Sequence, residues 1–421
     1  MWGMGSRSAA GGALFAAVLV FSGGVAVADG QGRVEVLHWW TSGGEARAVD
    51  TVKELLGEEG YTWVDFAVAG GIDNAMEVLD SRLRSGNPPA AAQILAASIE
   101  DWAEHDMYAD LGAVARSEGW DDILLESVRR FYKYDDEYVA VPLNIHRTNW
   151  MWYDPAVFRD AGVDVPSSWD GFVAAAHEIE ESGDVAVIIG DQAWQQSLVF
   201  QALVAGEMDG DQYRRAFEDR RPEALRSERV IRAFEKLAEL REVAGTPERS
   251  DDWDAATREV IRGNAAAQVM GDWAKSEFIG AGRQPGRDFG CRPVPGTDDR
   301  FLYSVDSLVM FQLDDAEDRR AQMTTARLLL RERFQAKFNL HKGSIPVRAE
   351  AMDDRFDDCA RRSLEAFEAA EDSDALRPAF SMLMPGPLEG AVNDVISAFY
   401  HGEYSATEAA EQLARVATEY D

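Results

Sequence analysis

Short apolar runs alternate with amphipathic stretches along most of the chain. The continuous runs predict buried strands, at residues 34–37, 91–96, 185–189, 265–270 and 302–311. Apolar residues at helical spacing predict helices, at residues 45–55, 74–84, 169–179, 209–240, 319–340 and 388–416. This alternation is typical of α/β proteins with wound, mostly parallel sheets. A length of 421 residues allows two or three domain-sized units.

One extended run is unusually long. Residues 139–153 are apolar and aromatic, interrupted by Asn144, His146 and Asn149. A segment of this length can pass from one lobe of a protein to another. We expect further connections of the same kind at the proline-rich residues 289–296 and at the break at residues 341–348.

Tryptophan follows several of the predicted strands, each time beside an acid or an amide. These groups are Trp39-Trp40 with Glu45, Trp194-Gln195 and Asp272-Trp273. Ligands of α/β proteins bind beyond the carboxyl ends of the strands. There an indole can cover the C–H face of a sugar while a carboxylate accepts hydrogen bonds from its hydroxyls.

The alternative for these tryptophans is core packing, which suits large aromatic residues. Core packing of both Trp39 and Trp40 is disfavoured because neighbouring strand residues face opposite ways. A shared cleft explains all three groups.

Motifs of catalysis and cofactor binding are absent from the sequence. It contains no G-x-S-x-G, H-E-x-x-H, P-loop or C-x-x-C motif, and its six histidines lack metal-ligand spacing. Paired carboxylates can make a glycosidase, but among 75 acidic residues any such pair is uninformative. We therefore expect a binding protein with no catalytic residue, metal or cofactor.

The N-terminal residues indicate export. Arg7 precedes the apolar residues 9–27, and Ala26-Val27-Ala28 is typical of a secretory signal cleaved after Ala28. The alternative is a retained membrane anchor. In an exported chain, an even cysteine count favours one disulfide, here Cys291–Cys359, over two free thiols.

The formal net charge is −33, from 75 acidic and 42 basic residues. This excess argues against nucleic acid as a partner, because phosphate binding requires basic patches. It also points to a salty environment, in which ions screen the self-repulsion of the surface.

Several segments resemble the periplasmic glucose-binding proteins of bacterial ABC importers, in the maltose-binding-protein-like family 1 of extracellular solute-binding proteins. They are "VEVLHWWTSGGEARAVDTVKELL", "GNPPAAAQI", "DEYVAVPLNIHRTNWMWYDPAVFRDAGV", "QVMGDWAKSE" and "KGSIPVR". The resemblance implies two α/β lobes of type II periplasmic-binding-protein fold, joined by three hinge crossings around a ligand cleft. The expected lobes are residues 31–143 with 303–343, and residues 144–302 with 344–421, after a signal peptide at residues 1–28. Family members also carry a bridged cysteine pair at these positions.

The resemblance also implies roles for individual residues. Trp40 and Trp273 would stack on the sugar faces, and Trp39, Glu45, Asp306 and Lys342 would bind hydroxyls. Further candidate ligand-binding residues are His146, Trp194, Gln195 and Asp272.

Three positions depart from the glucose-binding pattern. Leu95 stands where glucose binders typically carry Lys, Ser304 where they tend to have Asn, and Met382 lies in a late segment that lacks the expected His. Sites built for hydroxyls discriminate strongly through such polar groups. The departures favour a larger or less hydroxylated ligand, such as a glycoside. The alternative is that glucose binds with water filling the space.

The sequence thus predicts a monomeric periplasmic receptor that delivers a monosaccharide or small glycoside to an ABC permease. One alternative is an exported glycoside hydrolase or lyase that uses Glu45 with Asp272 or Asp306. Another is a sugar chemosensory receptor, which would bind its ligand in the same way.

The charge excess predicts a response to salt. We expect the melting temperature to rise from low to molar NaCl, because added ions screen the repulsion between surface carboxylates. Differential scanning calorimetry over this range checks the expectation. A flat or falling melting temperature contradicts it.

Overall fold

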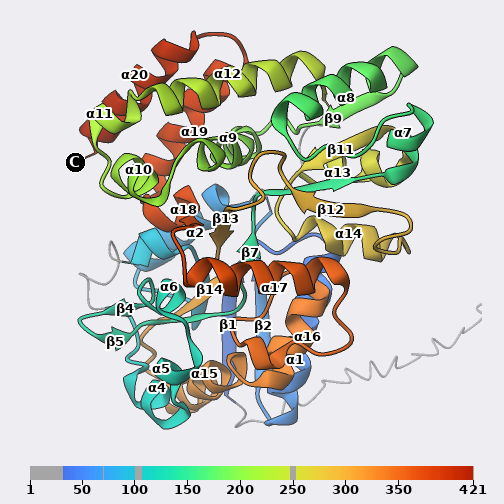
Figure 1. Cartoon of the computed structure of the whole chain (residues 1–421). Coiled ribbons are helices and arrows are strands. Elements are labelled where there is room, and N and C mark those ends of the chain that lie inside the picture. Colours follow the sequence, from blue (N-terminus) through green and yellow to red (C-terminus); the bar gives the residue numbers. More distant parts are fainter. Residues whose placement is uncertain (1–31, 70, 100–106, 247–252, 421) are drawn as a thin grey trace, which may run out of the picture.

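The protein is described here by a computed structural model of residues 32–69, 71–99, 107–246 and 253–420. The predicted signal peptide lies outside these residues. Two five-stranded sheets and one three-stranded sheet organise the fold. In Figure 1 the first sheet and its helices occupy the lower half of the molecule, and the second sheet and its helices occupy the upper half.

The first sheet has the order β2-β1-β3-β14-β6. Strands β2, β1 and β3 run parallel, while β14 runs antiparallel to both of its neighbours. Its strands are β1 (Arg33–His38), β2 (Thr62–Ala67), β3 (Ala91–Ile94), β6 (Ala140–Pro142) and β14 (Ser307–Met310). The helices of this lobe are α1 (Gly43–Glu58), α2 (Ile72–Arg84), η1 (Ala96–Ser98), α4 (Gly112–Glu118), α5 (Trp120–Ile123), α6 (Glu126–Arg129), α15 (Ala316–Leu329) and α16 (Glu332–Lys342).

The second sheet has the order β10-β9-β11-β8-β12. Strands β10, β9 and β11 run parallel, and β8 runs antiparallel to β11 and β12. Its strands are β8 (Trp150–Tyr153), β9 (Val185–Ile188), β10 (Ala244–Gly245), β11 (Ala265–Val269) and β12 (Gly290–Pro293). The helices of this lobe are α7 (Pro155–Asp160), α8 (Trp169–Ser182), α9 (Ala193–Glu207), α10 (Gly210–Tyr213), η2 (Arg214–Glu218), α11 (Pro222–Leu225), α12 (Glu228–Val243), α13 (Trp253–Arg262), α14 (Ala274–Gly280), α19 (Gly386–Tyr400) and α20 (Ala406–Glu419).

The third sheet, β15-β13-β7, lies between the two lobes (Figure 1). Its strands are β7 (His146–Arg147), β13 (Phe301–Ser304) and β15 (Leu376–Pro378). The run predicted at residues 139–153 divides into β6, β7 and β8, and each lies in a different sheet. This segment therefore runs from the first sheet to the second. The run at residues 302–311 likewise divides into β13 and β14, with Asp306 between them.

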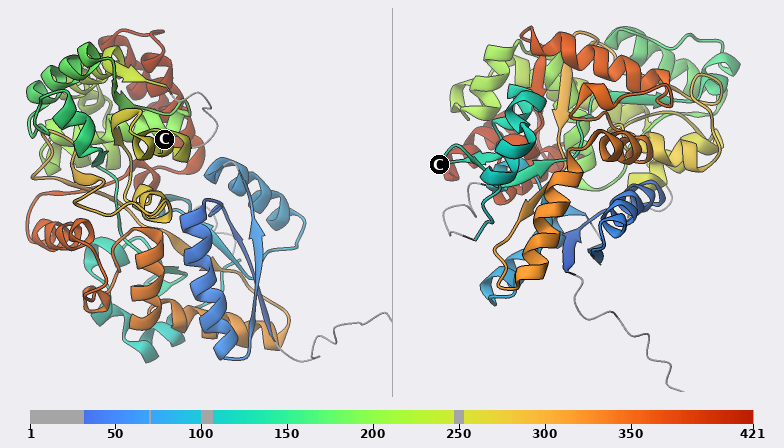
Figure 2. Two further views of the ribbon diagram at one scale, coloured as in Figure 1. Left: turned by 90° about the vertical axis from the view of Figure 1, so that its right-hand side faces the viewer. Right: turned by 90° about the horizontal axis from the view of Figure 1, so that it is seen from below.

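Each five-stranded sheet has its own apolar core. One buried cluster gathers around the first sheet and the other around the second, and Figure 2 shows the two lobes one above the other from a second direction. Among the helices described, none is long and apolar enough to cross a membrane.

Three long helices expected from the sequence are interrupted. The stretch at residues 209–240 breaks where Arg220 has a positive φ of 52° and Pro222 begins α11. The stretch at residues 319–340 breaks at Arg331, whose extended backbone caps α16. The stretch at residues 388–416 breaks near Gly402, with φ of 85°. Apolar periodicity continues through all three breaks, so it alone does not locate them.

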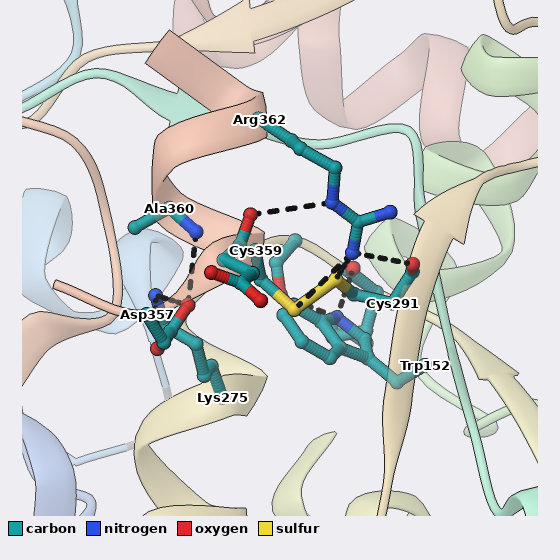
Figure 3. Close-up of a disulfide and its surroundings, with 10 residues drawn as sticks. Trp152, Lys275, Cys291, Asp357, Cys359, Ala360 and Arg362 are labelled. Carbon is teal, nitrogen blue, oxygen red and sulfur yellow. Dashed lines mark hydrogen bonds and ion pairs between the residues drawn. A yellow bond between two sulfur atoms is a disulfide. The ribbon is translucent and has the colours of Figure 1, made fainter. Parts of the chain in front are cut away.

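Helix α17 (Asp358–Glu371) connects the two lobes. Its side chain Phe367 packs in the core of the first lobe, with its ring centroid 5.2 Å from that of Phe301. Its first turn is fixed to the second lobe, because Cys359 forms a disulfide with Cys291 of β12 (Figure 3). The predicted disulfide is thus present. Beside it, Asp357 accepts a hydrogen bond from the backbone N–H of Ala360, capping the helix.

The remaining short elements are β4 (Lys133–Tyr134), β5 (Glu137–Tyr138), η3 (Ala349–Ala351) and α18 (Phe380–Leu383).

Loss of this disulfide should destabilise the protein. The bridge closes a sequence separation of 68 residues, and for a loop of that size the chain-entropy model gives a contribution of about 4 kcal/mol. We expect Cys291→Ser/Cys359→Ser to lower the free energy of unfolding by roughly 2–4 kcal/mol, measured by urea denaturation. The reduced wild-type protein should show the same loss. An unchanged transition midpoint contradicts the prediction.

Candidate ligand-binding site

Asp306 is the centre of a buried polar network where the lobes meet. Its Oδ1 accepts a hydrogen bond from Gln93 Nε2 at 3.0 Å. Its Oδ2 accepts one from Asn144 Nδ2 at 2.9 Å and lies 3.0 Å from His146 Nε2. The backbone N–H of Asp306 also donates to Asn144 Oδ1 at 2.9 Å. These bonds fix the carboxylate between β13 and β14, where the chain enters the first sheet.

Lys342 and Glu45 extend the network through the first lobe. Lys342 Nζ lies 2.8 Å from Glu45 Oε1 and 3.6 Å from Asp306 Oδ2. The other oxygen of Glu45 accepts hydrogen bonds from the backbone N–H groups of Thr41 and Ser42, each at 3.1 Å, so the same carboxylate completes the capping box of α1. The sequence T-S-G-G-E therefore places Glu45 by helix capping, and only one of its oxygens is used by Lys342.

His146 joins the network to the second lobe. Its Nδ1 contacts Asp272 Oδ1, while its Nε2 faces Asp306. Asp272 follows β11 of the second sheet, and its Oδ2 accepts a hydrogen bond from the backbone N–H of Arg147 at 2.9 Å. An imidazolium at position 146 can donate to one carboxylate from each lobe. The residue is 2% exposed, so solvent does not compete for these bonds.

The charges of the network shift one another's pKa values. Burial raises the pKa of Asp306, but the stronger combined effect of Lys342, His146 and Asn144 holds it well below its usual range. Burial lowers the pKa of Lys342, but Glu45 and Asp306 raise it above its ordinary value. Burial also lowers the pKa of His146, but Asp272 and Asp306 raise it. Each cation is thus stabilised by two carboxylates.

The adjacent tryptophans differ in their surroundings. Trp40 is 3% exposed, packs edge-on against Phe338 at 5.8 Å, and has Lys342 Nζ 5.7 Å from its ring centroid. Trp39 is only partly buried, and its backbone N–H donates to Gln93 Oε1 at 3.2 Å. Only one of the pair is thus a core residue. The stacking role of Trp40 stays a prediction, and Trp39 has the more accessible ring.

Trp273 contacts the network from the second lobe. Its partly buried ring meets the His146 ring edge-on, with centroids 5.0 Å apart and planes at 90°. It also contacts Trp253, with centroids 6.5 Å apart. The indole thus stands at the border between the network and the core of the second lobe.

Trp194 and Gln195 form a separate group at the start of α9. Trp194 Nε1 and Gln195 Nε2 both donate to Gln192 Oε1, at 3.0 and 2.9 Å. Gln195 Oε1 is buried, and within the described part of the chain it has no hydrogen-bond partner. No contact joins this pair to the Asp306 network among the residues described, so its predicted role in ligand binding stays a prediction.

The three departures from the glucose-binding pattern lie near the network. Leu95, which is partly buried, follows β3 two residues after Gln93. Ser304 is paired with His146 in the third sheet. Met382 is 1% exposed in α18, a helix that contacts η1 immediately after Leu95.

Sequence reasoning missed Gln93 and the direct role of Asn144. Gln93 was detectable as the single polar residue of the buried strand Ala91–Ile94, since a buried amide needs partners. Asn144 was noticed only as a polar interruption of an apolar run. Its two hydrogen bonds with Asp306 depend on how β6 and β14 pair. Within the described ranges, no group of three or more His, Cys, Asp or Glu is arranged to hold a metal ion.

The raised pKa of His146 predicts a pH dependence of stability. Its favourable contribution is complete below the unfolded pKa of about 6.5 and is lost as pH rises through the higher folded pKa. We expect the wild-type melting temperature to fall as pH rises from about 6.5 through the folded pKa of His146, and we expect the pH profile of His146→Gln to lack this fall. His177→Gln is the control, since His177 is exposed. An identical pH profile for wild type and His146→Gln contradicts the prediction.

Comparisons with known proteins agree with this architecture. The sequence pattern of the family described as "Bacterial extracellular solute-binding protein" matches residues 58–310. A "Probable sugar-binding periplasmic protein" of Brucella melitensis is 38% identical over 411 residues, covering 97% of each chain. A protein of the same description from Rhizobium meliloti is 37% identical over 384 residues, covering 90% of this chain and 92% of its own.

Solved structures show the same fold. The structure of a chitin oligosaccharide binding protein superposes with a TM-score of 0.77 at 15% identity, covering 92% of this chain and 98% of its own. At that identity the likeness supports the two-lobe fold alone. The family pattern spans more than half of the chain, and the Brucella relative extends over nearly all of it. The chain belongs to the family of bacterial extracellular solute-binding proteins.

Proposed function

We propose that this protein captures a neutral sugar or small glycoside in the periplasm and delivers it to the membrane permease of an ABC importer. Relatives described as probable sugar-binding periplasmic proteins support this, because they are similar over nearly the whole chain. As a member of a solute-binding family, the chain is a binding protein and not an enzyme, as predicted from the sequence. Export through a signal peptide cleaved after Ala28 and action as a monomer belong to the same proposal.

The Asp306 network carries the proposal. It offers carboxylate oxygens from Glu45, Asp272 and Asp306 as acceptors and the Lys342 ammonium as a donor. Sugar hydroxyls both donate and accept, and hydrogen bonds to charged groups are roughly twice as strong as neutral ones. Trp39 and Trp273 supply partly exposed indoles beside this network, one from each lobe, and such rings suit the C–H faces of a pyranose.

Three carboxylates against the Lys342 ammonium and the His146 imidazolium leave the network with a net negative charge, which also favours a neutral ligand. An anionic ligand, such as a sugar acid, would bring a further negative charge to buried carboxylates and would have to replace one of them. Beside the network, Leu95 and Met382 present apolar groups where a glucose binder has polar ones. We therefore favour a glycoside or a less hydroxylated sugar over free glucose.

Capture follows from closure of the lobes. We take residues 31–143 with 303–343 as one lobe and residues 144–302 with 344–421 as the other, although α17 packs in part on the first. The segments through β7, through β13 and near Lys342 act as hinges that absorb the change in backbone angles. A ligand bound to both Asp306 and Asp272 favours the closed state, because these carboxylates come from different lobes.

The indole of Trp273 provides a direct test. A thermal-shift screen of neutral sugars and glycosides in high salt identifies a ligand, and calorimetry measures its affinity. We expect Trp273→Ala to weaken binding about tenfold or more, corresponding to roughly 1.4 kcal/mol. Trp169→Ala in α8 is the control, since that indole bonds to Glu239 outside the network. Absence of binding across the screen would overturn the proposed function, and equal affinities of the two variants would overturn the role of Trp273.

A further inference from the structure

The two lobes touch at a second place, on the rim beside the network. Helix α1 of the first lobe and helix α14 of the second lie against each other there, as Figure 2 shows. The backbone N–H of Gly44 donates to Glu277 Oε1 at 3.1 Å. Arg47 Nη2 donates to the backbone oxygen of Ser276 at 3.1 Å. Both bonds run from α1 to α14, so each exists only when the lobes are together.

Gly44 allows this approach because it has no side chain. A Cβ at position 44 would lie 2.0 Å from Ser276 Oγ and 2.4 Å from Ser276 Cβ, far inside contact distance. Ser276 cannot simply turn away, since it is buried and its Oγ donates to the backbone oxygen of Trp273 at 2.7 Å. Gly44 itself is helical, and alanine is at least as good a helix former. The requirement for glycine therefore comes from the facing lobe and not from α1.

The rim contact adjoins two residues of the candidate site. Glu45, the partner of Lys342, directly follows Gly44, and Trp273 directly precedes α14. Glu277 also provides a carboxylate to the N-terminal end of α1, where the helix dipole favours negative charge. Closing the rim thus sets the separation between Glu45 in one lobe and Trp273 in the other.

We propose that Gly44, Arg47, Ser276 and Glu277 form a rim latch that determines ligand affinity by holding the two lobes together. Its four residues are positioning residues, because the latch acts through the placement of Glu45 and Trp273. The latch rests on the proposed function, since its effect is read through sugar binding.

A compensating pair of substitutions tests the rim latch. D-Glucose and methyl α-D-glucopyranoside are the probes, with calorimetry for affinity and small-angle X-ray scattering for compaction. We expect Gly44→Ala to weaken binding about tenfold or more and to reduce ligand-induced compaction, and Gly44→Ala/Ser276→Gly to recover wild-type affinity to within about threefold. Gly57→Ala is the matched control, because its Cβ would enter open space on the same helix.

The outcomes distinguish loss of the rim latch from a general loss of folding. A folded Gly44→Ala that binds and compacts like wild type, or a double variant that binds no better than the single one, overturns the rim latch. Amide exchange at Gly44 gives a readout without sugar: we expect it to be about tenfold or more faster in Glu277→Ala than in wild type. Equal rates overturn the latch whether or not a probe binds. If neither probe binds wild type, the proposed function fails for these sugars and the exchange result decides the latch.

Discussion

A carboxylate withdrawn from water must be compensated by charges and hydrogen-bond donors, and Asp306 meets this requirement at the point where the lobes join. It is 6% exposed and takes contacts from Gln93, Asn144, His146 and Lys342. Removal of one member from a buried charge pair typically costs about 3–5 kcal/mol, because the other is left unpaired. The positions of the surrounding segments are therefore coupled to this one side chain.

This requirement ties together segments that are distant in the sequence. Asn144 and His146 lie on the passage from the first sheet to the second, Asp306 lies on the return, and Lys342 ends α16. Gly343, with φ of 92°, ends that helix so closely against the backbone oxygen of Asp272 that a Cβ would lie 2.5 Å from it. The segments that connect the lobes thus also supply the polar groups of the network.

Helix α17 is attached to both lobes. Its Phe367 packs on β13, while Cys359 and the Lys275–Asp357 ion pair, at 3.2 Å, attach its first turn to the second lobe. Lys275 belongs to α14, the helix that follows Trp273 (Figure 3). The disulfide and the Lys275–Asp357 ion pair therefore restrain the first turn of α17 against the second lobe, one covalently and the other by charge.

The amino-acid sequence by itself determined much of the architecture. Apolar runs located β1, β3, β9 and β11, because a continuous apolar run marks a strand that is buried on both faces. Helical spacing located α1, α2 and α8, because it marks the buried face of a helix. The Trp-bearing turns after β1, β9 and β11, and the cysteine pair, were also visible in sequence. Helix breaks at Arg331 and Gly402 were not, since the apolar spacing continues across them.

Only the tertiary structure decided which of these residues meet. It joined Glu45, His146, Asp272, Asp306 and Lys342, added Gln93 and Asn144, and left Trp194 and Gln195 apart. It also buried Trp40 rather than Trp39, although the two are chemically equal and adjacent. Each of these outcomes depends on strand pairing and on the approach of two lobes. The residues that meet lie up to 297 positions apart in the sequence, as Glu45 and Lys342 do. The local sequence around each residue therefore does not indicate which distant residue it will contact.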